Sequence, residues 1–192
     1  MSKRLDTSCP AYVNFSANIS RDPVDDLMVL MADLHRQGFK EAHLLISSPG
    51  GGVIRGIELH NFLRGLPIQL STYNTATVDS IANIVYLAGD KRYVNQNANF
   101  LMHGVSWEFR GAVGEQQLEE ALAAVRRDQR VIADTIAGRT KLQRDHIERM
   151  FRGDNILTPA DAVTMGISHE IKDVEIPEKA HVFVITNPAP NR

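Results

Sequence analysis

Short apolar segments alternate with amphipathic ones through the first half of the chain, and this alternation constrains the fold more than any other feature. Residues 11–19 alternate between apolar and more polar side chains, as in a half-buried strand. Asp22-Pro23 opens an amphipathic segment that ends at Gly38, so a helix is expected there. Further strands are expected at residues 42–46, 67–74, 92–94 and 99–102, and further helices at 53–63 and 80–88. Such units favour parallel strands joined by right-handed crossovers, which predicts an α/β fold.

One predicted helix is unusually long. Residues 115–137 contain no proline or glycine and would span roughly 34 Å at about 1.5 Å per residue. Spacings of four and three residues give it a heptad seam with one polar member: Leu118, Leu122, Val125, Gln129, Ile132 and Ile136. The pattern leaves two interpretations open, an ordinary core stripe or an arm that packs against another subunit.

Domain organisation is expected to be simple. The chain has 192 residues, enough to bury a substantial core, and no linker or repeat divides it. We therefore expect a single domain over residues 1–192, with the core at about 12–171 and a peripheral segment at 172–192 that contains a strand-like stretch at 181–185. A helix is expected at 145–151, another after the N-cap Thr158, and a last core strand at 167–171.

Composition argues against several partners. The formal net charge is −2 with no basic stripe, so neither nucleic acid nor an anionic membrane is a first choice of partner. Cys9 is the only cysteine, which excludes an intrachain disulfide and favours a reduced setting. No apolar run approaches the ~20 residues that span a bilayer, and none follows the charged start at Lys3 and Arg4. A cytoplasmic protein is expected.

Three residues could carry chemistry. Ser80 lies where a predicted strand gives way to a helix, a position at which open α/β sheets place their sites. The simpler interpretation is that Ser80 or Asp79 only caps the helix. His103 follows an apolar strand and Asp154 lies in a turn, and each alone is more often structural. The other six histidines show no metal-ligand spacing, so no metal or cofactor is expected.

The segment Pro49-Gly50-Gly51-Gly52 follows a predicted buried strand. Consecutive glycines permit a close backbone approach, so their N–H groups could face a substrate carbonyl. A phosphate cradle is the alternative, because Gly50, Gly52 and Gly56 approximate a dinucleotide fingerprint. However, no acidic residue ends the next strand to hold a ribose, and the absence of Gly-Lys-Ser/Thr excludes a P-loop.

Four segments together resemble the ClpP family, the proteolytic subunits of the Clp protease. They cover residues 46–56 with the glycine run, 77–82 around Ser80, 98–103 ending at His103, and 153–167 beginning near Asp154. Each is a modest match alone, but their order and spacing are specific, and the likeness runs from about Tyr12 to Ile171.

The resemblance implies a crotonase-like fold of repeated ββα units with a helical arm, and a serine peptidase that cleaves short or unfolded peptides. Subunits would form rings that enclose a chamber. The rings are expected to be heptameric and could stack on one another. An AAA+ unfoldase would be the partner of such an assembly. Ser80, His103 and Asp154 fall on the catalytic triad, where His103 would take the Ser80 proton and Asp154 would orient the imidazole. The N–H groups of Gly51 and Ile81 are the candidates for an oxyanion hole.

Three departures from the family pattern keep alternatives open. Ala76-Thr77-Val78-Asp79 replaces small residues before the nucleophile, Gly104-Val105 replaces Gln-Pro after the histidine, and only about ten residues precede the first strand. The last argues against an unfoldase partner, since the family usually docks it through a longer N-terminal segment.

Two other functions therefore remain open. One is a catalytically silent ring subunit, and the other is an acyl-CoA hydratase or isomerase of the crotonase superfamily. Asp79 beside the nucleophile is the feature that favours a silent subunit. Its carboxylate would either face the site and raise the pKa of His103 or, as we expect, cap the following helix.

Overall fold

A mixed sheet forms the centre of the computed structural model, which describes residues 5–189; the charged start at Lys3 and Arg4 lies outside them. Six strands follow the order β6-β5-β3-β2-β1-β8, while β4 pairs with β3 and β7. The strands are β1 (Ala11–Ser16), β2 (Glu41–Ser48), β3 (Gln69–Asp79), β4 (Lys91–Val94), β5 (Asn99–Met102), β6 (Asn155–Leu157), β7 (Glu170–Ile171) and β8 (His181–Thr186). All pairs are parallel except β5 with β6, which confirms the α/β class.

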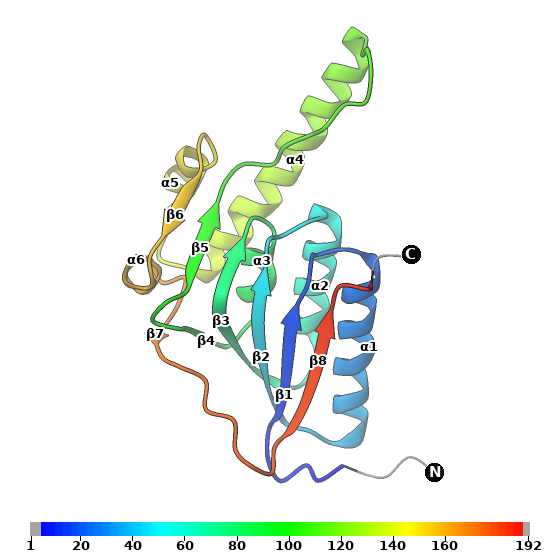
Figure 1. Ribbon diagram of the computed structural model, residues 1–192. Helices are drawn as coiled ribbons and strands as arrows, with labels where there is room; N and C mark the ends of the chain where they lie inside the picture. The colour runs from blue at the N-terminus through cyan, green and yellow to red at the C-terminus, as the bar shows by residue number, and fades with distance from the viewer. Residues whose placement is uncertain (1–4, 190–192) are drawn as a thin grey trace.

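Two helices, α1 (Arg21–Gln37) and α2 (Val53–Gly65), cover one face of the sheet (Figure 1). The apolar stripe of α1 is buried there: Val24, Leu27, Met31 and Leu34. The short helix α3 (Ala82–Tyr86) is buried along its whole length. The remaining helices are α4 (Glu115–Arg139), α5 (Arg144–Met150) and α6 (Pro159–Thr164), where Thr158 is the N-cap as expected and accepts a hydrogen bond from the Asp161 N–H.

Strand β3 is longer than the sequence pattern predicts. It was expected to end at Asn74 but continues to Asp79, because its last residues leave β4 and pair with β5, Thr77 opposite Asn99. The Asn74 side chain supports the switch by donating to the Asn99 carbonyl at 2.6 Å. The following helix consequently begins at Ala82 and not at Ser80. The expected strand at 167–171 is also shorter, since only Glu170 and Ile171 pair.

The peripheral segment returns to the sheet. Strand β8 lies parallel to β1, with Ala11 opposite His181, and forms one edge. Alternation along β8 buries Ile185 and leaves Val182 and Val184 exposed.

Helix α4 projects beyond the sheet, with the segment 103–114 running beside it (Figure 1). The two interpretations of its heptad seam each apply to a different part of the helix. Ile136 is 2% exposed and belongs to the main core, whereas Leu118 and Leu122 are each 49% exposed. The sheet end of the helix is therefore a core stripe, and its outer half is an apolar surface.

A buried arginine holds three loops together. Arg92 is 4% exposed, and its guanidinium donates to four backbone carbonyls, those of Ile167 (2.7 Å), Gly89 (3.2 Å), Arg139 (2.9 Å) and Gly166 (3.1 Å). No carboxylate of the described residues forms an ion pair with it. Arg92 thus joins the start of β4 to the end of α4 and to the turn after α6.

His60 makes the fold sensitive to acid. It is buried in α2 and donates through Nδ1 to the Ile84 carbonyl at 2.8 Å. Burial, followed by the charges of Arg139 and Arg64, lowers the pKa of His60 below its usual 6.5. The folded protein therefore binds fewer protons than the unfolded chain, so its stability is full above about pH 6.5 and falls as the pH drops below that value.

Urea unfolding from about pH 7.5 to about pH 5.5 should show this loss, and His60→Asn should reduce the slope of the profile. Part of the slope should remain, because burial also lowers the pKa values of His43 and His169. Exposed His146 provides the control, since His146→Asn should leave the profile unchanged. Identical slopes for wild type and His60→Asn would contradict the prediction.

Within residues 5–189, no helix is both long and apolar enough to cross a bilayer.

Candidate active site

Ser80 occupies a strained turn between β3 and α3. Its φ is 54°, the one positive φ at a non-glycine position among the described residues. This left-handed conformation costs about 1–2 kcal/mol for a residue with a Cβ. The turn is held by the Ser80 N–H, which donates to the Leu101 carbonyl at 2.8 Å, and by Asn83, whose Nδ2 donates to the carbonyls of Ser80 and Leu101 at 2.9 Å. Strain retained by surrounding bonds is typical of functional positions.

The glycine run packs directly against this turn. Gly50 has φ 89°, and a Cβ there would lie 2.7 Å from the Ser80 Cβ. Gly51 has φ 150°, and a Cβ there would lie 2.4 Å from the Ile19 carbonyl oxygen. Ile19 is bonded on both sides, donating to the Gly50 carbonyl and accepting from the Gly52 N–H, each at 2.8 Å. Only glycine fits at positions 50 and 51 in this arrangement.

Two residues with unpaired backbone N–H groups line the same pocket as Ser80. Gly51 and Ile81 both line that pocket, and neither N–H donates to an acceptor within residues 5–189. Unpaired N–H groups beside a hydroxyl can receive the oxygen of a carbonyl under attack. They are the two groups expected from the sequence to form an oxyanion hole.

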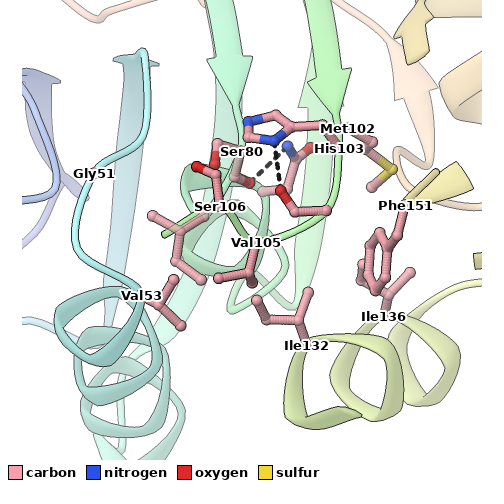
Figure 2. A pocket seen from close by; sticks show the side chains of 13 residues that line it. Gly51, Val53, Ser80, Met102, His103, Val105, Ser106, Ile132, Ile136 and Phe151 are labelled. Carbon is pink, nitrogen blue, oxygen red and sulfur yellow. Dashed lines mark hydrogen bonds between the residues drawn. The ribbon is translucent and has the colours of Figure 1, made fainter. Parts of the chain in front are cut away.

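The pocket has a polar side and an apolar side (Figure 2). It measures about 70 Å³, with Ser80 and His103 on the polar side together with Ser106. The apolar side comes from α2, β5, α4 and the end of α5: Val53, Met102, Ile132, Ile136 and Phe151.

His103 follows β5 and is half-buried. Its Nδ1 lies 2.7 Å from the Gly104 carbonyl oxygen, which fixes Nδ1–H as the donor in the neutral ring and leaves Nε2 as an acceptor. No hydrogen bond joins His103 to Ser80 or to Asp154 among the described residues. Asp154 is exposed and lines a second hollow, which it shares with His103, Gly104 and Phe151. The structure therefore brings Ser80 and His103 to one pocket, and His103 and Asp154 to the next, without the bonds of a triad.

Asp79 does not cap a helix, contrary to the interpretation we favoured from sequence. It is the last residue of β3, and its carboxylate accepts the Thr77 hydroxyl at 2.6 Å. Helix α3 starts three residues later, with no side-chain cap at Ile81. Asp79 is also absent from the lining of the Ser80 pocket. The extension of β3 explains this outcome, because it moves Asp79 from a helix start into the sheet.

Sequence reasoning missed two residues that shape the site. Asn83 is 1% exposed and ties the Ser80 turn to β5, and the signal was available as a lone amide within the apolar stretch 81–88. Gly104 departs from the family pattern, but nothing in the sequence indicates which residue it packs against. A Cβ there would lie 2.5 Å from the Phe151 carbonyl oxygen, so the close contact between the strand end and α5 is visible only in three dimensions. No cluster of three potential metal ligands occurs in the part of the chain that the structure describes.

Comparison with known proteins agrees with this architecture. The family model described as Clp protease matches residues 11–175. A curated relative, the ATP-dependent Clp protease proteolytic subunit of Deinococcus radiodurans, is 24% identical over 136 residues, which are 70% of this chain and 66% of the relative. This chain thus spans just under two thirds of that relative's length. Among solved structures, a mutant of ClpP1 from Listeria monocytogenes superposes with a TM-score of 0.75 at 22% identity, covering 85% of this chain and 91% of the other. Because the family model matches most of this chain, the chain belongs to the Clp protease family.

Proposed function

We propose that the chain is a serine peptidase with Ser80 as nucleophile, His103 as general base and Asp154 as the group that orients the imidazole. The observation that carries the proposal is the strained Ser80 turn, which holds Ser80 in one pocket with His103 and with Gly51 and Ile81, whose backbone N–H groups are unpaired. Membership of a protease family supports the same chemistry.

In the proposed reaction, Ser80 Oγ attacks a peptide carbonyl carbon while His103 Nε2 accepts the hydroxyl proton. The carbonyl oxygen gains negative charge, and the N–H groups of Gly51 and Ile81 donate to it; one such donor is typically worth about 3–4 kcal/mol in the transition state. His103 then returns the proton to the leaving amine, and water hydrolyses the acyl-enzyme by the reverse sequence. Asp154 stabilises the imidazolium once the ring turns from the Gly104 carbonyl toward it.

Covalent labelling tests the nucleophile. A fluorophosphonate probe should form one adduct, placed on Ser80 by mass spectrometry, and Ser80→Ala and His103→Ala should abolish it. Ser106→Ala is the matched control, because Ser106 lines the same pocket and its removal should leave the adduct in place. Asp154→Asn should slow labelling on the order of a hundredfold or more, since the imidazolium would lose its carboxylate. The exposed Asp145→Asn variant controls for charge.

A catalytically silent subunit is the second candidate, and one observation favours it. The His103 imidazole is bonded to the Gly104 carbonyl and not to Ser80 or Asp154. A folded, assembled protein that forms no adduct at Ser80 would select this function over the first. Unchanged labelling of Asp154→Asn would instead assign the orienting role to the Gly104 carbonyl.

We also propose that subunits associate through the outer half of α4 to enclose a chamber, in heptameric rings. Leu118 and Leu122 are half exposed there, and Trp107 on the adjacent segment is 53% exposed. Apolar surface of this kind is typical of interaction sites. The chamber would restrict substrates to short or unfolded peptides.

Light scattering at micromolar concentration should therefore show a large assembly. Leu122→Asp with Val125→Asp should split it, since an unpaired charge in a packed interface costs several kcal/mol, on the order of 3–5. Ala123→Asp, one residue along on another side of the helix, should leave it intact. A monomeric wild type would refute the chamber.

A further inference from the structure

A basic hollow lies between α4 and α5, beyond the pocket of Ser80. Its volume is about 420 Å³, and four arginines line it with a single glutamate: Arg126, Arg130, Arg144, Arg152 and Glu148. This local excess of positive charge contrasts with the formal net charge of −2 for the whole chain.

Most of this charge is not neutralised by the protein itself. Arg144 is paired, with Glu148 at 3.0 Å and with Asp134. Arg126, Arg130 and Arg152 form no ion pair with any residue between 5 and 189. Like charges gathered on two packed helices repel one another, and an anion bound between them removes that repulsion. Guanidinium groups bind carboxylates through two parallel hydrogen bonds, which makes a carboxylate a well-matched ligand.

A third hollow, which contains Asp154, shares lining residues with both the Ser80 pocket and the basic hollow. The Ser80 pocket shares His103, Gly104 and Phe151 with the hollow that contains Asp154. That hollow in turn shares Gln129, Phe151 and Arg152 with the basic hollow. A peptide extended from Ser80 along this path would bring its neighbouring residues to the arginines.

From these adjoining hollows we propose that the basic hollow is a subsite for acidic peptides, which selects substrates with an Asp or Glu a few residues from the cleaved bond. The inference rests on the proposed peptidase function for its kinetic consequence. The binding itself depends only on the arginines and the path that leads to them.

Paired peptides test the selectivity. Each is a short fluorescein-labelled chain of alanines with one central leucine, in which a single Asp is placed at each flanking position in turn, with Asn as its isosteric partner. At one or more positions on one side of the cleaved bond, the Asp peptide should show a kcat/KM on the order of tenfold higher at low salt, mainly through KM, because surface charge attraction is screened at high salt. Equal values for every Asp and Asn pair would overturn the proposal.

Charge reversal identifies the subsite. Arg130→Glu should remove or invert the preference for Asp. Arg127→Glu is the matched control, since Arg127 lies on the same helix outside the basic hollow, pairs with Asp128 at 3.0 Å and undergoes the same change of charge. An equal loss in both variants would mean a general field effect and would contradict a subsite.

Two further readouts separate the possible failures. Fluorescence anisotropy of the Asp and Asn peptides on the Ser80→Ala protein measures binding without catalysis. If no peptide is cleaved by the wild type but the Asp peptide still binds in an Arg130-dependent way, the peptidase proposal fails and the subsite stands; if it does not bind, the subsite fails too. The second readout is light scattering, which measures the oligomeric state of Arg130→Glu and Arg127→Glu. If the Arg130→Glu assembly dissociates and the Arg127→Glu assembly does not, the basic hollow belongs to an interface between copies of the chain, and the peptide proposal is overturned.

Discussion

Gly51→Ala is expected to disable the site and destabilise the fold, while Gly52→Ala, one residue further, is expected to be tolerated. A Cβ at Gly51 would lie 2.4 Å from the Ile19 carbonyl oxygen on a backbone with φ 150°, whereas at Gly52 the nearest atom would lie 3.5 Å away. Relief of that clash requires the loop to leave Ile19, whose two 2.8 Å backbone bonds to Gly50 and Gly52 anchor it. The Gly51 N–H would leave the pocket with it.

Loss of one oxyanion donor lowers turnover by about 10²–10³-fold, so fluorophosphonate labelling of Ser80 should slow to that extent in Gly51→Ala. The free energy of unfolding should fall by about 1–3 kcal/mol, the usual cost of backbone strain of this kind. Gly52→Ala should label at close to the wild-type rate. The φ of Gly52 lies in the ordinary range, and a Cβ there would lie at ordinary van der Waals distance from its nearest neighbour, 3.5 Å. Equal labelling of both variants would show that the Gly51 N–H plays no part.

Arg92→Met is expected to cause the largest loss of stability of any single change described above. The variant retains the apolar stem but removes every donor, so the carbonyls of Ile167, Arg139 and Gly166 would lose the hydrogen bonds that Arg92 donates to them, while the Gly89 carbonyl would keep its bond from Arg139 at 2.7 Å. Each unsatisfied buried acceptor costs about 1–3 kcal/mol, so a loss of about 3 kcal/mol or more is expected from a total stability of about 5–15 kcal/mol.

Arg64→Met is the control for Arg92, because Arg64 is 37% exposed and pairs with Asp90 at the surface. Exposed pairs contribute about 0–1 kcal/mol, so urea unfolding of this variant should resemble wild type. A similar small loss for Arg92→Met would mean that water replaces the guanidinium at those carbonyls.

How far the sequence predicts this molecule depends on the range of the interaction involved. Period-two and helical patterns located the strands and helices around Ala11 and Val24 because those patterns follow from local burial. The end of β3 could not be predicted in this way. Thr75 to Asp79 are mostly polar, and they remain extended because β5 pairs with them from another part of the chain.

The site shows the same division. The glycine run and the order of Ser80, His103 and Asp154 were readable as motifs, and the structure brings the first two of these residues to one pocket with Gly51. The side-chain partners were not readable. Asp79 was expected to cap a helix and instead bonds Thr77, and His103 bonds the carbonyl of Gly104, a residue whose tight packing against Phe151 depends on tertiary contacts.

The pairing of β8 with β1 has a consequence for how the chain folds. Strand β1 has β2 on one side soon after synthesis, but its other side is filled by a strand from the far end of the chain. Closing so long a loop carries a large entropic penalty before any contact repays it, so this pairing belongs to the slow, late steps. Until it forms, the β1 edge offers unpaired N–H and C=O groups beside apolar side chains, the arrangement from which strand-to-strand aggregation starts. The sheet of a nascent chain therefore stays open at β1 until β8 has emerged from the ribosome.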